Sequence, residues 1–180
     1  MKKPLRNDEE VFFSLVEGKL SALGSGEAWV VVQAANQSLK RGSSGGIIVL
    51  DEILAFEDCV LGWLERIANK EPIGLLTDDL NERIRGIPFI HLINPDEQGQ
   101  PRWEHIAVLD PGTPTQIKAA HAVSLFLASG GFKKLRRCKA DGCQMFFLGP
   151  SNRKWCSHNC GSRMRGRRLR KRRWQHRYAL

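Results

Sequence analysis

The chain has 180 residues, with 28 Lys or Arg against 19 Asp or Glu, a formal net charge of +9 and an apolar share of 42%. This length accommodates one medium-sized globular domain and a small appendage. No stretch approaches the roughly 18 apolar residues of a membrane-spanning helix, and the basic start breaks into Asp8, Glu9 and Glu10 before any apolar core. The sequence therefore predicts a cytoplasmic protein with neither a membrane span nor a signal peptide.

Helical periodicity dominates the first half of the chain. We expect four helices: one from Asn7 or Asp8 towards Leu23, one over 27–40, one over 51–68, and a short one that Thr77 caps and Gly86 ends. The Gly- and Ser-rich run at 42–46 is more typical of a connector than of a phosphate-binding loop, because no Gly-Lys-Ser/Thr follows it. Cys59 falls inside the third helix and is expected to be a buried thiol.

The periodicity then changes from helical to alternating. Residues 87–93 and 103–108 indicate two strands, and the Pro-, Asn- and Gly-containing segment between them indicates a turn. His91 and His105 are placed to face each other across this hairpin. We interpret them as an exposed cross-strand pair rather than as a metal site, because two histidines alone are weak evidence for a metal.

The segment before the cysteines reads as one more helix. Thr113-Pro114-Thr115-Gln116 has the form of a capping box with proline at the first helical position. The predicted helix carries Ile117, Ala120, Ser124, Leu127 and Ala128 and ends at Gly130-Gly131, and His121 on it is expected to be a packing or surface residue. The diglycine predicts a domain boundary, with a helical domain over 1–131 and a small domain over 132–180.

Four of the chain's five cysteines lie within 23 residues: Cys138, Cys143, Cys156 and Cys160. Two close pairs around a short connector are what a tetrahedral zinc site needs, and the second pair is spaced to face one way from the start of a helix. Disulfides are disfavoured because cytosolic thiols stay reduced. His158 remains an alternative ligand. Four protein ligands leave no open position for water, so we expect one structural Zn²⁺.

The run from Cys156 to Arg163, with Cys138 and Cys143 upstream, resembles the CGNR zinc finger of bacterial proteins. That finger ends many chains whose preceding domain is called ABATE and is described as a stress-induced transcription regulator. The resemblance implies a mostly helical N-terminal domain, zinc binding and DNA binding. Ser162 stands where the motif has asparagine. This difference leaves the four cysteines unchanged, but serine cannot take over any role that depends on the side-chain amide of asparagine.

Charge separates the two predicted domains. From Lys133 onwards there are sixteen Lys or Arg and one acidic residue, Asp141, so this part has a net charge of +15. Residues 1–132 contain the other twelve basic and eighteen acidic residues, so their net charge is −6. An arginine-rich run that continues from a zinc-fixed helix start favours phosphate contacts over a merely solvated tail. The candidate nucleic-acid-binding residues are Arg153, Lys154, Arg163, Arg165, Arg167, Arg168, Arg170, Lys171, Arg172 and Arg173.

The predicted class is therefore mainly α with one β-hairpin near 87–108, an α+β fold, plus a zinc finger that ends in a basic helix. No nucleophile, base and orienting group come together in the sequence, so no catalytic residue and no enzymatic activity are expected. The favoured function is a DNA-binding transcriptional regulator, nucleoid-associated in a bacterial cytoplasm. RNA or ribosome association and a protein-interaction adaptor are the alternatives. A ligand of the N-terminal domain and a homodimer are left open.

Overall fold

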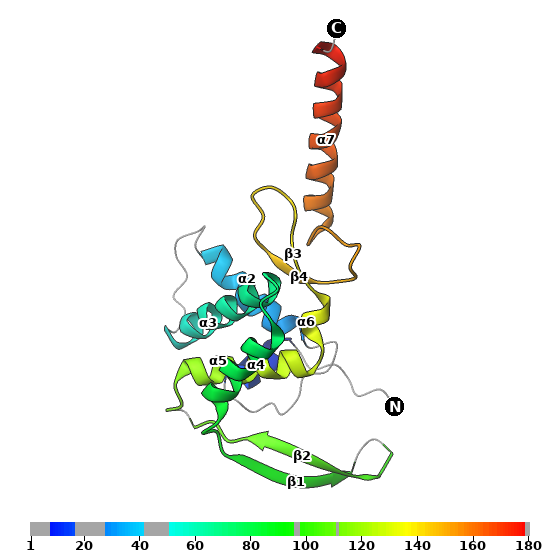
Figure 1. Cartoon of the computed structure of the whole chain (residues 1–180). Coiled ribbons are helices and arrows are strands. Elements are labelled where there is room, and N and C mark those ends of the chain that lie inside the picture. Colours follow the sequence, from blue (N-terminus) through cyan, green and yellow to red (C-terminus); the bar gives the residue numbers. More distant parts are fainter. Residues whose placement is uncertain (1–7, 17–27, 42–50, 96–97, 111, 179–180) are drawn as a thin grey trace.

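The computed structural model describes residues 8–16, 28–41, 51–95, 98–110 and 112–178 and has the expected α+β composition (Figure 1). The predicted extension of the first helix towards Leu23 and the connector at 42–46 lie outside these residues. The elements in chain order are α1 (Asp8–Val16), α2 (Trp29–Arg41), α3 (Asp51–Ala68), α4 (Ile73–Ile84), β1 (Phe89–Pro95), β2 (Pro101–Ala107), α5 (Thr115–Ala128), α6 (Gly131–Lys134), β3 (Leu135–Arg137), β4 (Phe146–Leu148) and α7 (His158–Tyr178).

The helical body is organised around α3, which packs against both α2 and α5. Its apolar stripe places Phe56, Val60 and Leu64 in the core, where all three are almost fully buried. Helices α1 and α4 pack on α5. The bounds of α3 match the prediction because Asp51 and Glu52 begin the helix and the stripe runs unbroken to Ile67.

Two predicted helix starts are wrong. Helix α4 begins at Ile73, and Thr77 lies inside it, where its hydroxyl donates to the carbonyl oxygens of Ile73 and Gly74 at 3.1 and 2.9 Å. Helix α5 has Pro114 rather than Thr113 at its cap position, with no side-chain capping bond. In both cases a proline precedes the first turn, where its fixed φ and missing N–H are tolerated. Proline was therefore the better signal of the helix start.

Helix α5 is buried on more than one side. Its buried residues include Ala119, Ala120 and Val123 but also Lys118 and His121. The Lys118 ammonium is paired with the Glu52 carboxylate at 2.5 Å. Because α1, α3 and α4 all pack on α5, small side chains are needed on most of its circumference.

The predicted hairpin is present, with strands at Phe89–Pro95 and Pro101–Ala107. They pair antiparallel with His91 opposite His105, as expected, and the two Nδ1 atoms lie 2.6 Å apart. The hairpin projects from the body at the end opposite to α7 (Figure 1). Within the described ranges, no helix combines the length and apolarity that a membrane crossing requires.

Candidate metal centre

The first cysteine pair lies on a short hairpin and its connecting turn. Strands β3 and β4 pair antiparallel, with Arg136 opposite Phe147, and the ladder continues as Cys138 N–H donates to the Met145 carbonyl at 2.9 Å. Beyond Cys138 the chain turns back at Gly142, whose φ of +73° is in the left-handed region that glycine adopts readily. Cys143 N–H closes this turn on Ala140 O at 2.9 Å. Asp141 and Gly142 therefore form a tight turn, which brings the two sulfurs to one side.

The second pair straddles the start of α7. Cys160 lies in the first turn of the helix and Cys156 lies two residues before its first residue, so the pair flanks the helix start, as its spacing predicted. Ser157 stands between them as the cap, and its Oγ accepts from Cys160 N–H at 3.3 Å. The Ser-x-x pattern before a helix was the available signal for this cap. The positive end of the α7 dipole consequently faces the sulfurs, where it favours thiolates.

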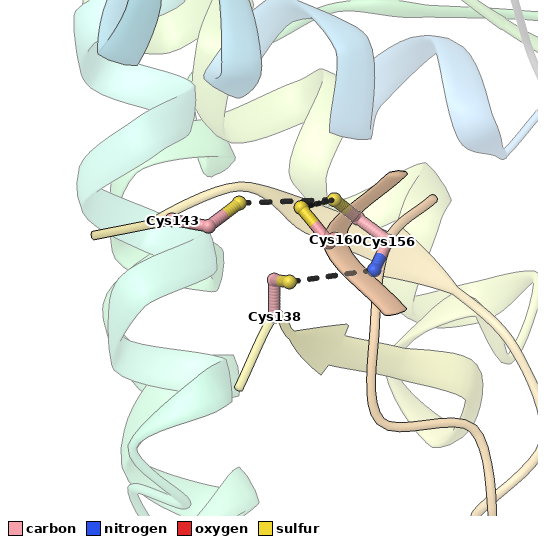
Figure 2. Close-up of side chains that lie close together, drawn as sticks. All are labelled: Cys138, Cys143, Cys156 and Cys160. Carbon is pink, nitrogen blue, oxygen red and sulfur yellow. Dashed lines mark hydrogen bonds between the residues drawn. The ribbon is translucent and has the colours of Figure 1, made fainter. Parts of the chain in front are cut away.

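Figure 2 shows the four cysteines converging, with all four sulfurs within 4.8 Å of one another. Cys156 Sγ lies 3.7 Å from Cys143 Sγ and 3.7 Å from Cys160 Sγ. A tetrahedral Zn²⁺ with Zn–S bonds of about 2.3 Å has S···S edges of about 3.8 Å. The donor set and its spacing therefore fit zinc. His158 is not part of this cluster.

The surroundings of the sulfurs show why a cation is needed among them. Burial raises the pKa of Cys156 to about 12, and its contacts with the other thiols add to the shift. Burial likewise raises the pKa of Cys143. Burial opposes ionisation of Cys138 too, but backbone hydrogen bonds from Cys156 and Ala140 outweigh it and lower the pKa of that thiol. Without a cation the thiols of Cys143 and Cys156 therefore favour their neutral form, and a divalent metal would stabilise all four cysteines as thiolates.

Consecutive residues of β4 point to opposite faces of the β3–β4 hairpin, and their side chains pack in two different hydrophobic cores. Phe147 packs with Cys138, Ala140 and the half-buried Trp155 beside the sulfurs. Phe146, by contrast, is buried in the core of the helical body. Strand β4 therefore contributes both to the helical body and to the segment that carries the cysteines, here called the finger.

Asn36 of α2 attaches this strand to the body. Its Nδ2 donates to Phe146 O at 2.9 Å, and its Oδ1 accepts from Phe146 N–H at 2.8 Å. Asn36 is only 4% exposed, so both backbone groups of Phe146 depend on it for partners away from water. Sequence reasoning missed this residue, although an asparagine on the apolar side of α2 was a signal that a buried polar partner existed.

We expect Asn36→Ala to lower the free energy of unfolding by about 2–4 kcal/mol, because it leaves the N–H and C=O of Phe146 buried and unpaired. Chemical denaturation followed by circular dichroism measures this change. Gln37→Ala is the matched control, since Gln37 is an exposed amide on the same helix and its loss should stay within about 0.5 kcal/mol. Equal effects of the two substitutions would contradict the role assigned to Asn36.

The structure gives several predicted nucleic-acid-binding residues partners within the finger. Arg153 donates to Trp155 O and Cys156 O at 3.1 and 2.8 Å and lies over the Phe147 ring, so it shapes the loop before α7. Arg163 donates to Asp141 O at 3.0 Å, and Arg167 pairs with the Asp141 carboxylate. Asp141, which sequence reasoning used only in the charge count and the turn, thereby holds α7 against the turn of the first cysteine pair.

The remaining candidates share an exposed position. Lys154 lies in the loop before α7, and the others project from the helix, which extends away from the body (Figure 1). Arg165 donates to Ser162 Oγ at 3.0 Å, so the residue that replaces the motif's asparagine contacts a neighbouring arginine. The exposed cations of α7 are Arg163, Arg165, Arg167, Arg168, Arg170, Lys171, Arg172 and Arg173.

A cavity of about 740 Å³ opens beside the metal centre, between α2, α3 and the turn of the first cysteine pair. Its lining includes Ser38 and Leu61 from the body and Gln144, Met145 and Arg163 from the finger. This volume is in the range of small-molecule sites. A molecule held there would contact both parts of the chain.

Residues 134–173 match the family model of the CGNR zinc finger. No protein in the set of curated proteins matches the chain. The matched segment contains the whole four-cysteine cluster, and such a finger with four cysteines at metal-binding distance is consistent with one structural Zn²⁺, as the sequence predicted.

Proposed function

We propose that the chain is a zinc-dependent DNA-binding transcriptional regulator. In this proposal the four cysteines hold the ion and the arginines of α7 contact duplex DNA. One observation carries it: a helix of 21 residues begins at the metal centre and projects from the protein with cations around its whole circumference. The zinc finger match supports the same reading. No catalytic role is proposed for any residue.

The dimensions of α7 suit the major groove of B-DNA. Its 21 residues span about 31 Å, and the groove is about 12 Å wide, enough for one α-helix. A helix in the groove has phosphates on both sides and base edges below it. Cations on all sides of α7 would therefore find phosphate partners, whereas without DNA most of them have only other cations of the helix as neighbours and repel one another.

The same geometry favours DNA over double-stranded RNA. The major groove of A-form RNA is deep and narrow and does not admit a helix with long side chains. We expect the zinc-loaded chain to bind a DNA duplex about tenfold more tightly than an RNA hairpin of equal length. Fluorescence anisotropy with both ligands at the same salt concentration measures the ratio.

The other outcomes of this competition identify the alternative functions. Tighter binding to the RNA hairpin would contradict the proposal in favour of an RNA- or ribosome-associated protein. Absence of salt-sensitive binding to either ligand would contradict it in favour of a protein-interaction adaptor whose finger is only a scaffold.

A regulator also needs the DNA-binding module to respond to the rest of the chain. The shared strand β4 and the Asn36 bonds supply a rigid connection between the core of the body and the metal centre. In our proposal a ligand or a partner of the body acts on α7 through this connection.

A further inference from the structure

The hairpin of β1 and β2 has little support from the other elements that the structure describes. Among the described elements, each of its strands makes extensive contacts only with the other strand. All of β1 is exposed, including Phe89, Ile90, Leu92 and Ile93, which are 40–59% accessible. A two-stranded hairpin alone is marginally stable in water. Exposed apolar residues on such an element indicate an interaction surface.

One face of this hairpin lacks charge altogether. Directly opposed residues of an antiparallel pair lie on the same face, and so do residues two apart along a strand. The register therefore gathers on one face, here called the histidine face, Phe89, His91, Ile93, Pro95, Pro101, Trp103, His105 and Ala107. Ala107 is buried within the chain, and the other seven are exposed. None of these is Lys, Arg, Asp or Glu. The opposite face contains Arg102.

The polar atoms at the centre of the histidine face are already paired. The two Nδ1 atoms of His91 and His105 lie at hydrogen-bonding distance, 2.6 Å apart, within a single hairpin. Burying this pair in an interface therefore costs less desolvation free energy than burying two unpaired imidazoles. On either side of them Ile93 and Trp103 are 59% and 60% exposed. This combination resembles the centre of a protein interface, which is rich in aromatic residues and poor in charge.

We propose that the histidine face is a homodimerisation surface, covered by the same face of a second copy of the chain. An isologous interface requires a patch that is complementary to itself. An apolar strip with a paired imidazole at its centre meets this condition, because its own copy brings no like charge against it. Duplex nucleic acid is disfavoured as the occupant, since the face has no Lys or Arg to contact phosphate.

The size of the face sets the expected strength. Its two strands of seven residues form a strip on the order of 24 Å by 10 Å. A stable interface buries about 800 Å² on each partner. The histidine face alone is smaller, so it supports a weak dimer, with a dissociation constant in the micromolar range or above, and does not depend on DNA binding.

Sedimentation velocity of the full zinc-loaded chain, freed of nucleic acid and held at high salt, tests the proposal. The average mass of the wild type should rise from one chain towards two as its concentration increases to about 0.5 mM. Ile93→Lys puts a charge on the histidine face and should weaken dimerisation at least tenfold. Ile90→Lys is the matched control on the same strand, because Ile90 is 50% exposed on the opposite face, and it should behave like the wild type.

Circular dichroism of each variant reports whether its fold is intact. If Ile93→Lys disturbs the hairpin, Trp103→Lys places the same charge on the same face from β2 and should give the same loss. A wild-type chain that stays monomeric over the whole concentration range would overturn the proposal. Equal losses of dimer affinity for Ile93→Lys and Ile90→Lys would also overturn it, because the dimer contact would then not be specific to the histidine face.

Discussion

Replacing Cys156 with serine is expected to remove the bound zinc and to unfold the chain beyond Leu148, while helices α2–α5 stay folded. Cys156 lies at the centre of the cluster, in contact with Cys143 and Cys160 through its sulfur and with Cys138 through its N–H. Zinc binding supplies about 10–16 kcal/mol in zinc-finger peptides, more than a segment of this size gains from its apolar core.

Without zinc, the turn that carries Asp141 loses its fixed position, so the contacts of Asp141 with Arg163 and Arg167 no longer hold the start of α7. Its eight cations between Arg163 and Arg173 then repel one another, and Gly166 weakens the helix further. The far-ultraviolet circular dichroism should lose roughly the contribution of this 21-residue helix. Hydrogen exchange should stay slow in α3 and α5, because their contacts with each other and with α2 and α4 do not involve the metal.

Metal analysis of the purified variant is the decisive measurement for this substitution. Zinc should fall from about one ion per chain to nearly none. Cys59→Ser is the matched control, since Cys59 is a thiol of α3 outside the cluster, and it should keep its zinc. Stoichiometric zinc in Cys156→Ser would contradict the assignment of Cys156 as a ligand.

Affinity for duplex DNA is expected to fall steeply with salt. Eight cations on α7 that each neutralise one phosphate give a slope of roughly −7 in a plot of log affinity against log salt. Between 50 and 200 mM salt this corresponds to a loss of about 10⁴-fold. Anisotropy titrations at several salt concentrations measure the slope, and a nearly flat line would contradict binding through phosphates.

Two charge variants locate the contacts on α7. Arg168→Ala combined with Arg172→Ala removes two cations from one face of the helix and should make the slope less negative by about 2. Arg102→Ala removes an exposed arginine from the β1–β2 hairpin and should leave the slope unchanged. If the double variant kept the wild-type slope, these two side chains would not be phosphate contacts.

The metal centre was predictable from the sequence because its signal is local. The spacing of Cys138, Cys143, Cys156 and Cys160 already specifies two turns that each bring a pair of sulfurs to one side. The same holds for α3, whose apolar stripe and acidic start set both of its ends. The His91–His105 pair followed from alternation alone, since the register of a hairpin is set over a few residues.

What the sequence did not reveal depends on contacts between distant segments. Asn36 binds Phe146 across 110 positions of the chain, and no periodicity indicates such a partner. Phe146 and Phe147 are adjacent residues of the same type, so the sequence does not say which ring is buried in the body. Phe146 is the one buried there, because α2 packs on its side of β4. Lys118 and His121 are buried because several helices pack on α5, and the number of helices around α5 does not follow from its own sequence.

The account depends most on a metal ion that fixes the start of α7. Elemental analysis of the freshly purified, reduced wild-type protein measures this directly. We predict one zinc ion per chain, lost on chelation together with the helical signal of α7. A reduced, folded protein that contains no metal, and whose α7 persists in a chelator, would contradict the central claim.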